Sequence, residues 1–188
     1  ETSCDETAAA VLDGEGRVLG DVVRTQIDEH RLFGGVVPEL ASRCHIEAID
    51  AVVAEALARA GIGVEGLRAV AATAGPGLVG CLLVGLSWAQ GLAAARGLPL
   101  LAVNHLEGHL LAPFIGRPEP LYPFLGLVVS GGHTELVHAR GPGDLEIVGQ
   151  TRDDAAGEAF DKGARVLGLP YPGGIAVDQL AKQGNAAA

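Results

Sequence analysis

The chain alternates apolar runs with glycine-rich turns and helical patterns, and this alternation restricts the fold more than any other feature. Leu67–Thr73 reads as a strand, Ala74–Gly77 as a glycine-rich turn, and residues 78–96 as a helix. Leu100–Val103 is the next apolar run, and a further helix is predicted to begin near Asn104. Together with 28 glycines and only 4% aromatic residues, this order predicts an α/β protein with close-packed helices on sheets.

The N-terminal part of the chain predicts a hairpin followed by one long helix. Ala8–Leu12 reads as a buried strand, Asp13–Gly16 as a tight turn, and Arg17–Val23 as the returning strand. Residues 25–35 are predicted to form a polar loop. Apolar residues at helical spacing then predict a helix over 38–60, with a proline as its first residue and a glycine directly after it.

The predicted helix over 78–96 is rich in glycine, alanine and serine. Small residues let another helix approach closely, so we expect this helix to be buried on two sides. Leu78–Ala95 is also the run that comes nearest to a membrane helix, which needs about 18 apolar residues. Glycines, Ser87 and Gln90 interrupt it, so we expect no membrane-spanning segment.

The second half of the chain predicts a separate, smaller sheet. Residues 117–123 carry three prolines and form the best candidate for a hinge. The division expected here is a first lobe over residues 1–116 and a second over residues 117–188. The second is predicted to contain strands at 124–129, 134–140 and 145–150, helices at 155–167 and 175–183, and a turn at 171–174.

Charge and cysteine content exclude some classes of function. The net charge is −10 and the 13 basic residues are scattered, which disfavours non-specific binding of nucleic acid. If RNA is a substrate, a local patch or a partner must supply the attraction. Three widely spaced cysteines without a Cys-x-x-Cys motif, and no signal-peptide pattern, predict reduced thiols in a cytoplasmic protein. The mean hydropathy of +0.32 hints at apolar surface that meets a partner.

His105 and His109 stand four residues apart at the start of a predicted helix. Their imidazoles would lie one above the other on one helix face, which suits two nitrogen ligands to one metal ion. A pair of surface histidines is the simpler interpretation of an isolated His-x-x-x-His. A zinc protease of the His-Glu-x-x-His type is disfavoured, because Leu106 stands where the catalytic glutamate is required and Glu107 points about 200° away from His105.

Two further stretches could bind a nucleotide. Ser130–Thr134 joins two predicted strands with paired glycines that allow close approach of a ligand to the backbone. The simpler interpretation is an ordinary hairpin turn. Near the start of the chain, Asp5 and Glu6 lie among hydroxyl-bearing residues, a combination that suits a magnesium-nucleotide site but also suits a polar surface turn.

Seven blocks of the sequence together resemble the bacterial TsaD family, formerly called Gcp or glycoprotease, and the resemblance spans the whole chain. The resemblance implies an actin/hexokinase/Hsp70-like (ribonuclease H-like) two-lobed fold, truncated in the second lobe. The blocks are Glu1–Thr7, Gly34–Arg43, Thr73–Gly80, His105–His109, Val129–Thr134, Asp153–Lys162 and Tyr171–Gly174.

The resemblance also implies a reaction and a set of site residues. The reaction is transfer of a threonylcarbamoyl group from threonylcarbamoyl-adenylate to the exocyclic amine of the adenosine next to the tRNA anticodon. His105 and His109 would bind an iron or zinc ion, and Asp5 and Glu6 would act in catalysis through the first phosphate motif. The substrate would be bound by Val128, Val129, Ser130, Gly131, Gly132, Asp161, Gly174 and Asp178.

Further expectations follow from the resemblance. The implied ligands are Fe²⁺ or Zn²⁺ and Mg-ATP or an adenylate, and the implied partners are tRNA and TsaB-like and TsaE-like proteins. Members of the family begin a few residues earlier and continue well beyond residue 188, so residues 1–188 are expected to be inactive alone. A homodimer through helices 38–60 and 78–96 is a further prediction, because these helices carry more apolar surface than one sheet face can cover.

Two other functions remain as alternatives at this point. One is a metalloprotease of the glycoprotease type, against which the position of Glu107 argues. The other is a nucleotide-binding subunit without chemistry of its own.

Overall fold

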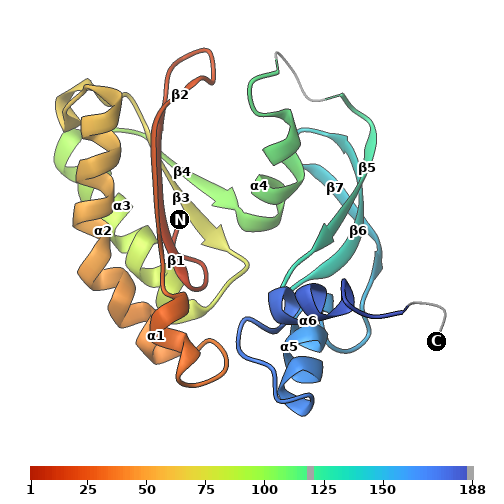
Figure 1. The fold of residues 1–188 in the computed structure, drawn as a ribbon. Coiled ribbons are helices and arrows are strands. Elements are labelled where there is room, and N and C mark those ends of the chain that lie inside the picture. Colours follow the sequence, from red (N-terminus) through yellow and green to blue (C-terminus); the bar gives the residue numbers. More distant parts are fainter. Residues whose placement is uncertain (118–120, 186–188) are drawn as a thin grey trace. The chain divides into compact units, whose positions relative to one another are not determined.

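The computed structural model describes residues 1–117 and 121–185, and the chain divides into two compact units. Unit 1 comprises Glu1–Gln26 and Val36–Pro118, and unit 2 comprises Ile27–Gly35 and Glu119–Ala188. Residues 27–35 thus group with the second unit, which no pattern in the sequence indicated. Both units combine strands and helices (Figure 1), so the predicted α/β class is confirmed.

The strands of unit 1 form two separate pairs. β1 (Glu6–Leu12) and β2 (Val18–Thr25) form the predicted antiparallel hairpin, with a shift of register next to its turn. β3 (Val70–Gly75) and β4 (Leu100–Asn104) pair in parallel. Since the carboxyl ends of parallel strands lie at one edge of a sheet, the residues that follow β3 and β4 are brought close together.

Three α-helices of unit 1 follow these strands: α2 (Pro38–Ala60), α3 (Val79–Arg96) and α4 (His105–Leu111). Short 3₁₀ turns occupy Val64–Gly66 and Ala112–Phe114. The helix α2 covers the hairpin, and its buried face packs against the inward side chains of β1 and β2. This core consists of Val11, Val22, Ala48, Val52, Ala56 and Leu57.

The helix α3 packs on α2 and on the strands β3 and β4. Cys81, Ala89 and Ala93 are buried, whereas Val79 and Leu83 are 74% and 57% exposed. Two elements thus cover parts of α3, the helix α2 and the strand β3, while Val79 and Leu83 stay exposed in the described part of the chain, so the expected burial on two sides is met in part. By length and composition alone α3 could cross a membrane, a property it shares with core helices of soluble proteins.

A cavity of about 330 Å³ lies between the two strand pairs of unit 1. Ala8–Val11 of β1 and Ala69–Ala72 line it from the two sheets, and Trp88 of α3 contributes to its wall. No strand pairing joins β1 to β3 among the described strands. Among the described strands, β1 and β3 therefore each pair with a neighbouring strand along one edge only.

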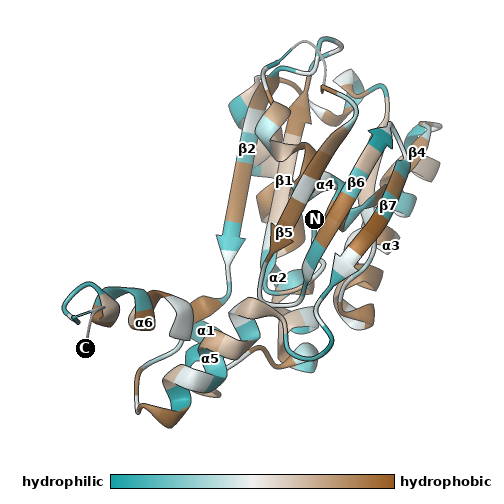
Figure 2. Cartoon of the chain, turned by 90° about the vertical axis from the view of Figure 1, so that its right-hand side faces the viewer, coloured by the Kyte–Doolittle hydropathy of each residue, from teal (hydrophilic) through white to brown (hydrophobic). Residues whose placement is uncertain are grey.

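Unit 2 contains a three-stranded antiparallel sheet and three helices. Its strands β5 (Phe124–Val129), β6 (Thr134–Gly141) and β7 (Asp144–Gln150) lie in sequence order, which confirms the three predicted strands. β5 is predominantly apolar, brown in Figure 2. The helices are α1 (Ile27–Arg31), α5 (Ala156–Val166) and α6 (Gly173–Ala181).

Two predictions for these regions differ from the structure. The loop predicted over 25–35 contains the helix α1, so that prediction is wrong in part. The helix α6 begins at Gly173, although the glycine pair Gly173–Gly174 was predicted to belong to a turn. Gly173 lies so close to α5 that an added Cβ would stand 2.6 Å from the Cβ of Ala164. Of the hinge predicted over 117–123, residues 118–120 lie outside the described residues.

Candidate functional site

The two histidines of α4 converge on one point, as their spacing predicted. Asn104 caps the helix, and its Oδ1 accepts hydrogen bonds from the backbone N–H groups of Leu106 (2.9 Å) and Glu107 (3.2 Å). This cap fixes the first turn directly after β4. The Nε2 atoms of His105 and His109 lie 3.1 Å apart, and the rings meet edge to face.

This separation is compatible with a shared metal ion. Two nitrogens bound tetrahedrally at about 2.0–2.1 Å would lie about 3.3 Å apart, close to the observed distance between the Nε2 atoms. Among residues 1–117 and 121–185, no group of three histidine, cysteine or acidic side chains is arranged to hold a metal. His105 and His109 therefore fit two positions of a metal ion and leave the others to further ligands.

The second ring nitrogen of His105 faces a small polar cluster. Its Nδ1 lies 3.3 Å from Oε2 of Glu1 and 3.2 Å from Oγ of Ser3. The hydroxyl of Thr73, near the end of β3, donates a 2.5 Å hydrogen bond to the same Oε2 of Glu1. The parallel pairing of β3 and β4 brings Thr73 next to the helix that follows β4.

The carboxyl group of Glu1 is ionised at neutral pH. Burial alone would raise its pKa, but hydrogen bonds from Ser3 and Thr73 outweigh this effect and lower the pKa to about 2. A carboxylate that accepts several hydrogen bonds is stabilised in its charged form. Glu1 therefore acts as a hydrogen-bond acceptor toward His105.

The turn that carries these residues is anchored to α3 by Thr2. The Thr2 hydroxyl donates to the carbonyl of Cys81 (2.7 Å) and accepts from the N–H of Gly85 (3.1 Å). It thus stands between a carbonyl and an amide that are four residues apart in the helix. Thr2 is 2% exposed, and Leu78 N–H donates to the carbonyl of Ser3 (2.8 Å), so this side of the turn is held firmly.

The opposite side of the turn is anchored to α2 by His45, which is fully buried. Its Nε2 lies 2.9 Å from the carbonyl oxygen of Cys4, so Nε2 carries the hydrogen and donates it. Its Nδ1 accepts from the hydroxyl of Thr7 (2.7 Å) and faces Nε2 of Gln26 (3.3 Å). Burial lowers the pKa of His45, which keeps the ring neutral in this arrangement.

The predicted catalytic acids lie between these two anchors. Asp5 is half-buried in the turn, and its carbonyl accepts a hydrogen bond from the N–H of Gln26 (3.0 Å). Glu6 is exposed at the start of β1, opposite Thr25. Burial, together with the charge of Asp5, raises the pKa of the neighbouring Cys4 thiol to about 12. Cys4 is therefore unsuited to act as a thiolate nucleophile.

In unit 2, the predicted ligand loop is a compact turn closed around the hydroxyl of Ser130. This hydroxyl oxygen accepts from the N–H groups of Gly132 (3.3 Å) and His133 (2.9 Å). The N–H of Ser130 donates to the carbonyl of His133 (2.8 Å). Val128 is buried and Val129 is exposed on the preceding strand. The N–H groups of Gly132 and His133 thus find their hydrogen-bond acceptor within the turn itself.

The N-terminus of α5 packs directly on this turn. The N–H of Gly157 donates to the carbonyl of Ser130 (3.0 Å), and the N–H of Ala156 donates to Oγ1 of Thr134 (2.8 Å). An added Cβ at Gly157 would lie 2.8 Å from Cα of Gly131, which is too close without a shift of the backbone. Gly157 therefore allows a contact that no larger residue would permit.

The remaining predicted binding residues lie where α5 meets α6. Oδ1 of Asp161 accepts a 2.7 Å hydrogen bond from the N–H of Gly173, next to Gly174. A cavity of about 80 Å³ adjoins Asp161 and is also lined by Arg165 and Tyr171. Asp178 is exposed and forms an ion pair with Lys182 (2.6 Å).

The predicted site residues fall into two groups, one in each unit. His105, His109, Asp5 and Glu6 belong to unit 1, and all the predicted substrate-binding residues belong to unit 2. Sequence reasoning assigned no role to Glu1, Thr73 or His45. The role of Thr73 could have been predicted from its position near the end of β3, because β3 pairs in parallel with β4, the strand directly before His105.

Comparisons with known proteins agree with the resemblance in the sequence. The family described as "TsaD: tRNA N6-adenosine threonylcarbamoyltransferase" matches residues 17–188. A tRNA N6-adenosine threonylcarbamoyltransferase of Anaeromyxobacter dehalogenans (strain 2CP-C) is 66% identical over 188 residues, which are 100% of this chain and 56% of that protein. One of Clostridium beijerinckii is 58% identical over 185 residues, which are 98% of this chain and 55% of that protein.

Two solved structures share the fold at low sequence identity. YeaZ from Pseudomonas aeruginosa has a TM-score of 0.52 and 20% identity, covering 84% of this chain and 67% of that one. The ROK hexokinase from Thermus thermophilus has a TM-score of 0.51 and 18% identity, covering 97% of this chain and 67% of that one. The chain spans about half the length of the curated relatives it matches.

Proposed function

Because this chain belongs to the TsaD family of tRNA N6-adenosine threonylcarbamoyltransferases, we propose that it takes part in transferring a threonylcarbamoyl group to tRNA. The donor is threonylcarbamoyl-adenylate, and the acceptor is the exocyclic amine of the adenosine next to the anticodon. The observation that carries this proposal is the 66% identity to such a transferase along the entire chain. The proposed enzyme is thus an acyltransferase of tRNA modification.

The donor is proposed to bind at unit 2. The turn Ser130–Gly132 and the valines before it would contact the acyl-adenylate, and Asp161, Gly174 and Asp178 would contact its sugar and nearby groups. Two features support this proposal: α5 fixes the shape of the turn through Gly157, and Asp161 already accepts a hydrogen bond beside the small cavity. Adenylate is a good leaving group, so the amine needs mainly to be oriented.

The residues of unit 1 are proposed to hold an iron or zinc ion through His105 and His109. When bound, such an ion can polarise a carbonyl or phosphoryl oxygen. The 3.1 Å separation of the two Nε2 atoms supports this role. Asp5 and Glu6 are proposed to act next to the nucleotide phosphates, where Mg²⁺ would accompany them.

The proposed context is a cytoplasmic protein of the actin/hexokinase/Hsp70-like type that works with TsaB-like and TsaE-like partners. The exposed apolar side chains on the outer face of α3 support a protein contact there. When no partner is present, we propose that a second copy of the chain packs against α2 and α3 to form a dimer.

The test is an activity assay on a chimera in which residues 1–188 replace the matching part of the Anaeromyxobacter dehalogenans relative. The chimera is incubated with unmodified tRNA, threonine, bicarbonate, ATP and the partner proteins, and the modified nucleoside is measured by mass spectrometry. We expect modification with the chimera, none with residues 1–188 alone, and a loss of at least 100-fold in the chimera with His109→Ala.

Three results would contradict the proposal. One is absence of the modified nucleoside while the parent relative is active. Another is cleavage of a protein substrate that depends on His109, which would favour the metalloprotease. The third is nucleotide binding without transfer in a folded chimera, which would favour a non-catalytic subunit.

A further inference from the structure

We propose that Glu1 is a positioning residue that orients His105 for the metal ion, with Thr73 holding Glu1 in place. This inference rests on the proposed metal site at His105 and His109. It concerns the side of the His105 ring that faces away from His109, where Glu1, Ser3 and Thr73 lie.

The first argument concerns the position of the proton on His105. Oε2 of Glu1 lies 3.3 Å from Nδ1, and an ionised carboxylate can only accept a hydrogen bond. In the neutral His105 ring this contact favours the hydrogen on Nδ1, where the hydroxyl of Ser3, 3.2 Å away, can also accept it. Its Nε2 then presents a lone pair toward Nε2 of His109, 3.1 Å away. A metal ion requires that lone pair.

The second argument concerns how firmly the carboxylate is held. Thr73 donates to the same oxygen that faces His105, at 2.5 Å, and the N–H of Ser3 donates to the other oxygen of Glu1. Ser3 itself is 3% exposed. A ligating histidine commonly donates its other N–H to a carboxylate, which fixes its tautomer and raises its basicity.

The third argument concerns the path by which this contact connects distant segments. Thr73 reaches the cluster because β3 pairs in parallel with β4, whose end leads directly into His105. Ser3 is fixed by the hydrogen bond between its carbonyl and Leu78. The orientation of His105 thus depends on the N-terminal turn with Glu1 and Ser3, on the end of β3, and on Leu78 directly before α3.

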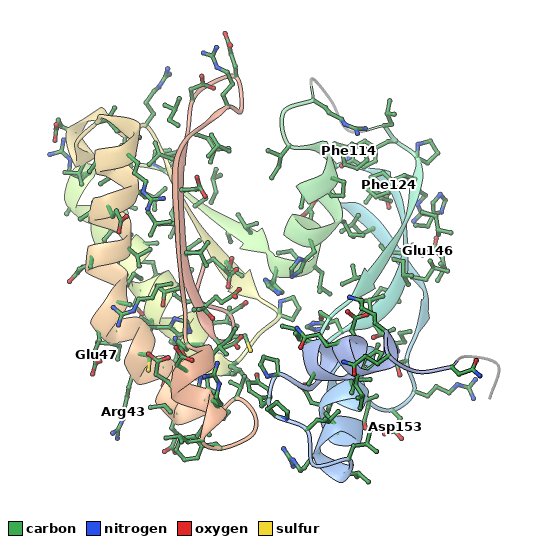
Figure 3. The ribbon with its side chains drawn as sticks, in the orientation of Figure 1. Arg43, Glu47, Phe114, Phe124, Glu146 and Asp153 are labelled. Carbon is green, nitrogen blue, oxygen red and sulfur yellow. The ribbon has the colours of Figure 1, made fainter. Side chains whose placement is uncertain are left out.

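The experiment measures the tautomer of His105 and the metal affinity separately. Long-range ¹H–¹⁵N NMR at pH 8 reports which ring nitrogen carries the hydrogen, without any metal. Titration with Co²⁺, followed by absorption spectroscopy, reports the affinity of the histidine pair. The variants are Glu1→Gln, Glu1→Ala and Thr73→Val, and Glu47→Gln is the matched control, since Glu47 is exposed on the outer face of α2 (Figure 3).

We expect His105 to hold its hydrogen on Nδ1 in the unchanged chain and in the Glu47→Gln control. Glu1→Ala is expected to give a mixture of tautomers and to weaken Co²⁺ binding about 10–100-fold, the usual effect of losing such a contact. Glu1→Gln keeps an acceptor oxygen and should lose less. Thr73→Val should shift both readouts in the same direction as Glu1→Ala, but by a smaller factor.

The outcomes separate this inference from the proposed metal site. Equal Co²⁺ affinity and an unchanged tautomer in a folded Glu1→Ala variant would overturn the inference, while loss of binding in His109→Ala would still support the metal site. If the unchanged chain and the chimera bind no Co²⁺ through the histidines, the metal site is overturned. The role of Glu1 as an orienting residue for a metal is then overturned with it.

Discussion

Acidification should weaken unit 1 through His45, the buried histidine that joins α2 to the first turn. Its pKa is lowered by burial, so the unfolded chain takes up a proton at a higher pH than the folded chain does. The stability that the neutral ring contributes is complete above the ordinary histidine pKa of about 6.5 and is lost as the pH falls below it. For one histidine the loss is at most about 1.4 kcal/mol per pH unit.

The hydrogen bonds of His45 determine how much unfolding free energy is lost when the residue is replaced. His45→Gln leaves the carbonyl of Cys4 and the hydroxyl of Thr7 imperfectly paired in a buried site. We expect a cost of about 1–3 kcal/mol at pH 7.5, as for other buried polar groups that lose a partner. Because the variant lacks the titrating group, its disadvantage should shrink between pH 6.5 and 5.5, by up to about 1.4 kcal/mol.

The assay is urea unfolding at pH 7.5, 6.5 and 5.5, followed by the fluorescence of Trp88. This is the only tryptophan of the chain and lies in unit 1, as His45 does, so its fluorescence reports on the unit that contains His45. All other side chains are the same in both proteins, so their contributions cancel in the difference. A difference in unfolding free energy that stays constant over this pH range would refute the reasoning.

Three further predictions concern the ligand loop, the binding residues and the helices. Gly157→Ala should push the Ser130–His133 turn away from α5 and weaken adenylate-analogue binding at least tenfold in calorimetry. Gly163→Ala, with open space around its Cβ, should leave that affinity unchanged, and equal affinities in both variants would contradict the packing argument. Asp161→Ala in the chimera should weaken the same binding without lowering the melting temperature of unit 1, whereas unchanged affinity would exclude Asp161 from the site. Leu83→Glu should shift light-scattering masses from dimer toward monomer, and a monomeric unchanged chain at high micromolar concentration would exclude the proposed dimer.

The sequence predicted the elements whose ends carry strong local signals. The bounds of α2 were predicted at 38–60 and are observed at Pro38–Ala60, because proline fits the first helical turn and Gly61 adopts a positive φ of 69°. The convergence of His105 and His109 also follows from local spacing. These features depend on residues within one or two helical turns of each other.

Features that depend on distant contacts could not be predicted in this way. α1 has five residues, too few for a recognisable apolar period. α6 starts within a glycine pair, because Gly173 must approach α5 closely, and glycines in a sequence otherwise indicate a turn. The contact of Glu1 with Thr73 and His105 joins residues 72 and 104 positions apart, which only the pairing of β3 with β4 reveals.

The cavity between β1 and β3 has a consequence for handling the protein. Backbone groups along the unpaired edge of a strand form a template on which another extended chain can add. The two strands that border this cavity are rich in small apolar residues, including Ala8, Ala9 and Ala10 on one side and Ala71 and Ala72 on the other. Concentrated or heated solutions should therefore gain cross-strand assemblies that bind amyloid dyes, and an extended apolar peptide added in excess should delay their growth.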